Sequence, residues 1–234
     1  KNAPQDESKF RSIALKHYSN NPGIDHLIGR KMSQKYRFRQ GAAAQRQALV
    51  FDEDYVAAKI QLAQDLLRLG ADDEAEGWRL AAEVHEEDGF DVTAYNLVTL
   101  KDTTDKYVSL TNEHFIVRME KREATIWGGR ALAHLEEAHR ELTKKYDIDL
   151  LRTTIVEIFA SQNDFGVRTF GMPGNPGFLG VCFGSVITAN SPSTQTGNPS
   201  NWEAVLWHEF AHVITLTKTK NKMPRWLSEG ISVY

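Results

Sequence analysis

Two histidines and a glutamate stand at a spacing that suits metal chemistry. His208, Glu209 and His212 form the pattern H-E-x-x-H inside an apolar, helix-like stretch. Residues four apart on a helix lie about 40° apart around its axis and about 6 Å apart along it, so both imidazoles can reach one tetrahedral ion. Glu209 is then placed to take a proton from a water bound to that ion. The pattern predicts a zinc site with a hydrolytic water.

Glu229 is the candidate third ligand. It lies 17 residues beyond His212, after Trp226, Leu227 and Ser228, in a second helix-like segment. A glutamate at that place could instead be a first-turn charge of the helix or a partner of its N-cap. With Glu229 as ligand, one Zn²⁺ is expected on His208, His212 and Glu229, and Glu209 is expected to be the general base.

The ligand-bearing helix needs a defined start and a buried setting. Ser200 is a suitable N-cap and Glu203 stands three positions later, which is the capping-box pattern and predicts a helix over about residues 201–217. Apolar residues cover most of its circumference, so the helix is expected to be buried. Buried histidine and glutamate side chains are costly unless they are paired or bind a metal, which favours a metal site over ordinary helix residues.

Strands before this helix would build one wall of a cleft. Residues 115–119, 153–160 and 181–189 have the apolar, β-branched composition of strands. A Gly- and Pro-rich stretch occupies residues 166–180, and residues 191–199 read as a solvated loop. An exposed edge strand can pair with an extended peptide, and residues 180–190 are the candidate for that edge. An ordinary core strand is the alternative.

Other residues with chemical potential have plainer interpretations. Residues 124–146 read as one long helix, on which His134 and His139 are five apart and about 140° apart in angle. They cannot share a metal in the H-E-x-x-H manner and are expected to be surface residues. Cys182 is the single cysteine, which excludes an internal disulfide and a cysteine-based zinc site. Its apolar surroundings favour a buried inert thiol over a nucleophile.

Helical periodicity dominates the N-terminal third. A helix is predicted over residues 55–69, ended by Gly70, and a second over residues 72–87. The unit from 56 to 89 is 34 residues long and resembles a tetratricopeptide repeat in length and in its small and apolar positions. Such repeats could form a groove for a protein partner or a brace packed on the next domain.

These patterns predict three parts of the chain. Residues 1–41 form a polar segment with a short helix near 9–18, residues 42–105 form the repeat-like helices, and residues 106–234 form the metal-binding domain. A polar linker is expected over residues 101–112. The last residue, Tyr234, falls within a helix-like segment, so the domain is expected to be incomplete at its C-terminus.

Composition narrows the class of protein. Among 234 residues, 41% are hydrophobic and 25% are charged, as in ordinary globular proteins. A net charge of −3 gives no electrostatic reason to expect nucleic acid as a partner. No apolar run reaches the roughly 18 residues that a membrane-spanning helix needs, so no span is predicted. The chain starts at Lys1 and not at Met, which favours a processed extracytoplasmic protein over a cytoplasmic one.

The H-E-x-x-H helix together with residues 223–230, Met-Pro-Arg-Trp-Leu-Ser-Glu-Gly, resembles the gluzincin zinc metallopeptidases. The arrangement is most similar to peptidase-MA-like proteins, which often carry tetratricopeptide repeats. The resemblance implies an α+β fold in which helical hairpins precede a mixed sheet packed on the ligand helix. It also implies a peptide or protein substrate, with Glu209 acting first as base and then as proton donor to the leaving amine.

Two departures from the gluzincin pattern affect the functional prediction. Only 16 residues separate His212 from Glu229, so the connection must be tight. Gluzincins also place a Tyr or His beyond the third ligand to stabilise the oxyanion, and that residue is expected beyond Tyr234. Two non-enzymatic readings stay open: a scaffold with repeats and a structural or vestigial zinc site, and a cleft that binds an extended peptide without turnover.

Overall fold

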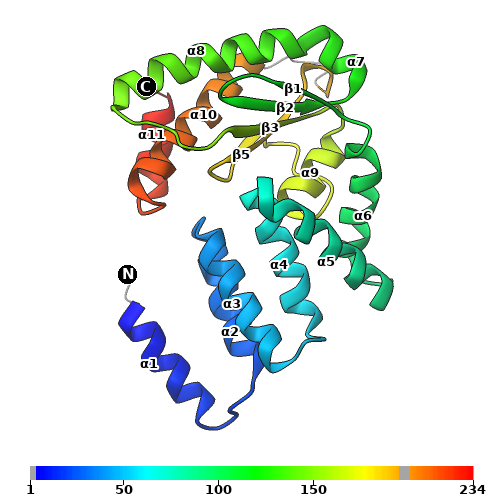
Figure 1. The fold of residues 1–234 in the computed structure, drawn as a ribbon, viewed down its shortest axis with the longest axis vertical. Helices are drawn as coiled ribbons and strands as arrows, with labels where there is room; N and C mark the ends of the chain where they lie inside the picture. The colour runs from blue at the N-terminus through cyan, green and yellow to red at the C-terminus, as the bar shows by residue number, and fades with distance from the viewer. Residues whose placement is uncertain (1–3, 195–200, 234) are drawn as a thin grey trace.

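Paired helices form the N-terminal part of the computed structural model, which describes residues 4–194 and 201–233 (Figure 1). In chain order these helices are α1 Pro4–Leu15, α2 Pro22–Ser33, α3 Phe38–Phe51, α4 Val56–Leu69, α5 Glu74–Glu87 and α6 Val92–Thr104. From α2 onward, each helix packs against the next along the chain. Alanine and leucine side chains fill the contact between α4 and α5, which allows the two helices to approach closely.

The two helices predicted for the repeat-like unit correspond to α4 and α5, and helical pairing begins upstream of them. Helix α2 lies within the segment 1–41 that was predicted to be polar, and it packs against α3. Helix α1 begins and ends earlier than the helix expected near 9–18. The resemblance of this array to tetratricopeptide repeats stays a prediction.

A five-stranded mixed sheet follows the helices. Its strands are β1 Val108–Thr111, β2 Phe115–Met119, β3 Thr154–Phe159, β4 Gly180–Cys182 and β5 Val186–Asn190. Their order in the sheet is β1-β2-β3-β5-β4, with β2, β3 and β5 mutually parallel and both edge strands antiparallel to their neighbours. The chain therefore combines helices with one mixed sheet, which agrees with the predicted α+β class.

Three local predictions are corrected by the structure. Strand β1 lies inside the expected linker 101–112, where pairing with β2 determines its conformation. Helix α9, Gln162–Phe170, overlaps the start of the Gly-rich stretch and is capped by Ser161. The single strand predicted over 181–189 is two strands, β4 and β5, because the chain reverses at Gly184 with φ +113°. Strand β4 is an edge and β5 is internal, so each alternative for residues 180–190 holds for part of the segment.

The long helix predicted over 124–146 is present with an earlier start. A short helical turn α7, Lys121–Glu123, continues through a π-helical segment, Ala124–Gly128, into α8, Gly129–Tyr146. The apolar side of α8 carries Ala131, Leu135, Ala138 and Leu142, all of which are buried. It packs on the sheet and on α10, Trp202–Thr219.

Helices cover both faces of the sheet. Alternate residues of β2 and β3, such as Val117 and Ile158, pack with α8 and α10 in one core. The opposite face of β3 presents Phe159 to a second core that it shares with α4, α5 and α9. Figure 1 shows the resulting layers, with α8 and α10 on one side of the strands and α4, α5 and α9 on the other.

Buried charges join the helical part to the sheet. Nη1 of Arg118 on β2 lies 2.7 Å from Glu74 Oε1 on α5 and 3.5 Å from Glu157 Oε1 on β3. Nε of Arg168 on α9 forms a close ion pair with Glu157 Oε2 at 2.7 Å, without hydrogen-bond alignment. The Nη2 group of Arg168 donates to the carbonyl of Leu67 on α4. The network therefore connects five elements, α4, α5, α9, β2 and β3, across the boundary predicted near residue 105.

Membrane-crossing helices are not found among the described residues, since none of the helices in 4–194 and 201–233 is both long enough and apolar enough.

Candidate metal centre

Helix α10 carries the H-E-x-x-H pattern and begins where the sequence predicted. The predicted cap, Ser200, lies outside the described residues, and the side chain of Asn201 accepts a hydrogen bond from the Ala204 N–H in that role. Glu203 binds Arg130 of α8 through two hydrogen bonds of 2.6 and 2.7 Å. The observed contacts therefore tie the start of α10 to α8.

The structure brings together the three residues predicted as ligands. On α10, the Nε2 atoms of His208 and His212 lie 3.1 Å apart. Helix α11, Arg225–Val233, carries Glu229, whose Oε2 lies 3.3 Å from His208 Nε2 and 3.4 Å from His212 Nε2. Zinc–nitrogen and zinc–oxygen bonds of about 2.0–2.2 Å at tetrahedral angles separate ligand atoms by about 3.4 Å. The three donor atoms thus form a triangle of the size that a tetrahedral zinc ion requires.

Two serines of α11 orient His212. Its Nδ1 lies 2.9 Å from Ser228 Oγ and 3.2 Å from Ser232 Oγ, and all three side chains are buried. Ser228 Oγ also lies 2.9 Å from Thr215 Oγ1 on α10. Hydrogen bonds at one ring nitrogen fix the tautomer and leave the other nitrogen available to a metal, so Nε2 of His212 is the atom free to coordinate an ion.

Glu209 is buried between α10 and the edge strand β4. Burial, followed by the negative charge of Glu229, raises the pKa of Glu209 to about 8. The backbone N–H of Cys182 and the guanidinium of Arg225 act in the opposite direction and favour the ionised form. A carboxyl group whose pKa lies close to neutral pH can both accept and release a proton.

Strand β4 presents its backbone to this carboxyl group. Leu179 and Phe183, which flank the strand, bond to β5 through the Asn190 N–H and the Val186 carbonyl. The alternation of an antiparallel ladder therefore directs the polar backbone groups of Gly180 and Cys182 to the open edge. Burial raises the pKa of the Cys182 thiol, which agrees with the predicted inert thiol.

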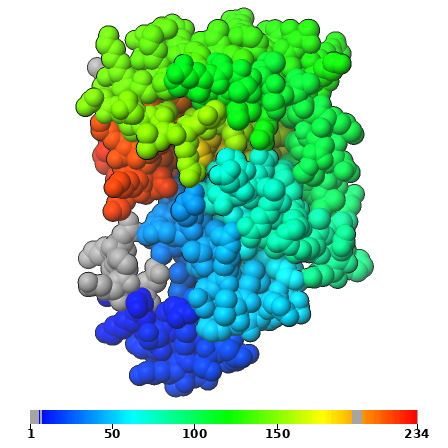
Figure 2. Space-filling model, viewed as in Figure 1, coloured from blue at the N-terminus to red at the C-terminus, as the bar shows by residue number. Residues whose placement is uncertain are grey.

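A cavity of about 870 Å³ lies over these residues. Its walls come from β4, α10, α11 and, from the far end of the sequence, the turn between α2 and α3. In this turn Gln34, Lys35 and Tyr36 line the cavity, and the Tyr36 carbonyl accepts a 2.7 Å hydrogen bond from Asn221 Nδ2. Figure 2 shows the α11 end of the chain and the α2–α3 part on the same face.

Sequence reasoning missed several residues of this centre. Tyr36, which adopts φ +59°, could not be found because 185 positions separate it from Asn221. Ser228 and Ser232 had a detectable signal, since a spacing of four places both on one face of α11. The expected oxyanion-stabilising residue was placed beyond Tyr234, and Tyr234 itself lies outside the described residues.

The two histidines of α8 are less exposed than predicted. His134 Nε2 lies 2.9 Å from the Glu203 carbonyl, and the His139 ring stacks on His114. As predicted from their spacing, they do not converge on one point.

Comparisons of this chain with protein-family models, with curated proteins and with solved structures found no match.

Proposed function

We propose that this chain is a zinc-dependent metallopeptidase of gluzincin type. The observation that carries the proposal is the triangle of donor atoms on His208, His212 and Glu229, with sides of 3.1 to 3.4 Å, beside the buried carboxyl group of Glu209. Among side chains, two imidazoles and one carboxylate are the ligand set that catalytic zinc uses in peptide hydrolysis, with a position left for the reactants.

The ion would be held by His208, His212 and Glu229. Zinc in such a site polarises a carbonyl group and lowers the pKa of a bound water to about 7. Ser228 and Ser232 keep the His212 ring in the orientation and tautomer that expose Nε2 to the ion.

Glu209 moves the proton. It lies one residue from His208 on the side of α10 that faces β4, where Gly180 leaves room for its side chain. As a carboxylate it accepts a proton from the attacking water, and as a carboxylic acid it gives that proton to the leaving amine. The Cys182 N–H and Arg225 support the first form, and burial supports the second.

An extended peptide is the substrate class that fits the walls of the cavity. The open edge of β4 offers the N–H and carbonyl of Gly180 and the carbonyl of Cys182, to which a peptide strand can add, while the Cys182 N–H is directed to Glu209. The turn with Gln34, Lys35 and Tyr36 bounds the cavity on the opposite side. The helical part of the chain therefore serves as a wall of the site, which favours the brace over a separate partner-binding groove.

Metal analysis combined with two substitutions tests this function. We expect tag-free protein to hold about one equivalent of tightly bound zinc at the α10–α11 site. Glu229→Ala should release this zinc and Glu209→Gln should retain it, and both should abolish cleavage of a mixed peptide library. Glu203→Gln, on the same helix but paired with Arg130, is the matched control.

Zinc content that Glu229→Ala leaves unchanged would contradict the ligand assignment. Zinc bound through Glu229, with no cleavage of any peptide, would support the alternative of a structural site on a non-catalytic scaffold.

A further inference from the structure

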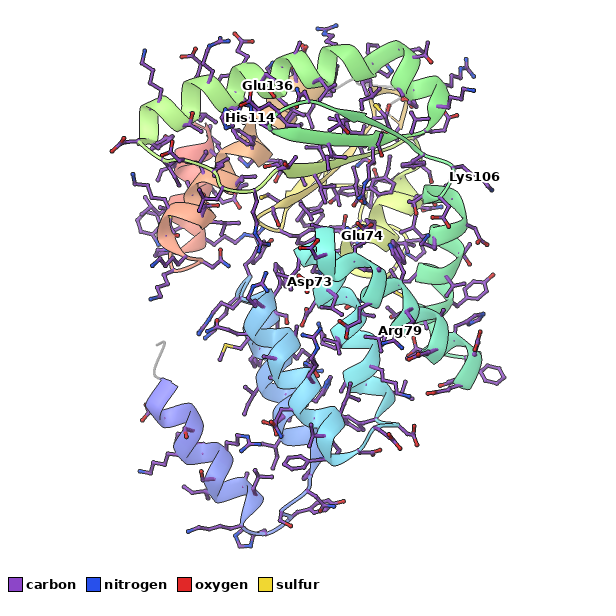
Figure 3. The ribbon with its side chains drawn as sticks, in the orientation of Figure 1. Asp73, Glu74, Arg79, Lys106, His114 and Glu136 are labelled. Carbon is purple, nitrogen blue, oxygen red and sulfur yellow. The ribbon has the colours of Figure 1, made fainter. Side chains whose placement is uncertain are left out.

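A second group of metal-ligand side chains lies where α8 meets the start of β2. His114 immediately precedes β2, and Glu136 and His139 stand three positions apart on α8. A spacing of three places both helical residues on one face of the helix. Figure 3 shows His114 and Glu136 beside each other, where the turn between β1 and β2 meets α8.

The donor atoms of this group are close together. Nδ1 of His114 lies 2.8 Å from Glu136 Oε2, and the rings of His114 and His139 stack with centroids 3.7 Å apart. One donor atom from each residue lies within 4.8 Å of the other two. Tetrahedral zinc needs separations of about 3.4 Å, so binding would require rotation of these side chains, of which His114 and Glu136 are partly exposed.

A second observation points to a cation. Within the described part of the chain, the other oxygen of Glu136, Oε1, is buried and accepts no hydrogen bond. A buried carboxylate oxygen without a partner is unfavourable, and a bound cation would satisfy it. Glu113 adds negative charge, since its Oε1 lies 3.9 Å from His114 Nε2.

We propose that His114, Glu136 and His139 form a second metal site, which binds a divalent transition ion such as Zn²⁺. Imidazole and carboxylate together suit zinc and its neighbours, whereas Ca²⁺ and Mg²⁺ prefer oxygen ligands alone. The ion would link the turn between β1 and β2 to α8. His139 also packs edge-on against the ring of Phe115, and the centroids of the His139 and Phe210 rings lie 6.0 Å apart. In the sequence Phe210 stands between the two α10 histidines. The second metal site would therefore stabilise the packing of α8 and β2 against α10. This proposal does not depend on peptidase activity.

Zinc stoichiometry in four forms of the tag-free full chain tests the second site. After equilibration with Zn²⁺ and desalting, elemental analysis should find about two equivalents in the unsubstituted chain. It should find about one after His208→Ala with His212→Ala, about one after His114→Asn with His139→Asn, and none after all four. Equal zinc content with and without the His114 and His139 substitutions would overturn the proposal.

The two proposals fail in distinguishable ways. If only the α8 site exists, zinc is lost with His114 and His139 and kept without His208 and His212. If only the α10–α11 site exists, the reverse is found, and the second site is refuted.

A milder variant protects the test against misfolding. Glu136→Gln changes a half-exposed carboxylate and should weaken zinc binding in the form that lacks His208 and His212 by roughly 10-fold or more. It should also remove the zinc-dependent rise in melting temperature, whereas Glu137→Gln, the exposed neighbour, should retain it. The same response in both variants would count against the site. Addition of Mg²⁺ alone should give no rise.

Discussion

At the scale of single residues, the position of Glu209 depends on the absence of a side chain on the facing strand. A Cβ atom on Gly180 would lie 2.8 Å from Glu209 Cγ, 3.0 Å from Glu209 Oε1 and 2.9 Å from Val205 Cγ1. Real Cβ atoms do not approach so closely, so an alanine there must displace the carboxyl group. Glycine at this place on β4 is therefore a requirement of the proposed chemistry and not only of the strand.

Gly180→Ala should accordingly lower kcat for peptide cleavage by roughly 10- to 100-fold, because small displacements of a catalytic group have effects of that size. Zinc content should not change, since the three atoms nearest to the new methyl group belong to Glu209 and Val205, which are not proposed ligands. Gly177→Ala is the matched control, because Gly177 lines the same cavity and a Cβ there would meet no atom within 4 Å. Equal kcat in the two variants would show that Glu209 is not held by this contact.

Asp65 provides a second residue-scale test, in the helical part. Its carboxyl group is buried on α4, accepts a 2.6 Å hydrogen bond from Ser33 Oγ, and has its pKa raised to about 6 by burial. The folded state thus holds this proton at a pH where the unfolded chain has released it. The resulting stabilisation is complete below about pH 4 and is lost as the pH rises to about 6, with a total of about 3 kcal/mol.

Asp65→Asn stays neutral throughout and should remove this part of the pH dependence. Urea unfolding between pH 4 and pH 7 should show the free energy of unfolding falling less in Asp65→Asn than in the unsubstituted chain. Asp72→Asn, at an exposed carboxylate after α4, is the control and should keep the full decline. Parallel curves for all three proteins would mean that Asp65 is ionised in the fold.

At the scale of elements, α11 supplies both a proposed zinc ligand and the support for another proposed ligand. Glu229 supplies one corner of the donor triangle, and Ser228 and Ser232 contact Nδ1 of His212 at another corner. One short helix thus fixes two of the three ligands, and its placement on α10 determines whether the triangle exists.

Ser228→Ala should weaken zinc binding by roughly 10- to 100-fold, the usual effect of losing a hydrogen bond behind a ligand. Competition with a chromophoric chelator measures this change directly, and Ser228→Ala combined with Ser232→Ala should have the larger effect. Val233→Ala, at the exposed side of α11, should bind zinc like the unsubstituted chain. If the serine variants also do so, Nδ1 of His212 is oriented by something else.

The sequence predicted best those elements whose signal is local. Helices α4 and α5 have clear 3.6-residue periodicity, α10 is a long apolar segment with a start signal at its N-terminus, and β2 and β3 are rich in β-branched residues. Strand β1 was missed because its four residues alternate in a polar context and gain their conformation from β2. Helix α9 was missed because Gly166 suggested a loop, although the close approach of the Met172 and Gly174 carbonyls explains that glycine. Such contacts are not visible in sequence.

At the scale of the whole molecule, the helical part and the sheet part share both a cavity and a charge network. The spacing of His208, His212 and Glu229 in the sequence was sufficient to predict that their side chains meet. The predicted boundary near residue 105 falls between α6 and β1. The contribution of Gln34, Lys35 and Tyr36 to the cavity was not predictable, because it depends on how distant elements pack. A prediction that treats the N-terminal helices as a separate domain therefore omits one wall of the cavity.

Arg168→Met tests the charge network. Removing this guanidinium leaves Glu157 buried with only the more distant Arg118, so the free energy of unfolding should fall by about 3–5 kcal/mol. Urea unfolding of Arg168→Met and of Arg79→Met gives the comparison. Arg79 pairs with Glu83 on the exposed side of α5, and its loss should cost less than about 1 kcal/mol. Similar losses in both variants would show that the network contributes little to stability.

The strand order β1-β2-β3-β5-β4 has a consequence for biosynthesis. Helix pairs such as α4 and α5 join neighbouring segments and can form as soon as the ribosome releases them, whereas β3 must wait for β5, about thirty residues later, to complete the sheet. The α10 histidines follow only after β5. For the proposed zinc site, we therefore expect the ion to enter a scaffold that is largely assembled, so that metal loading would be a maturation step and the nascent chain would not need the ion to begin folding.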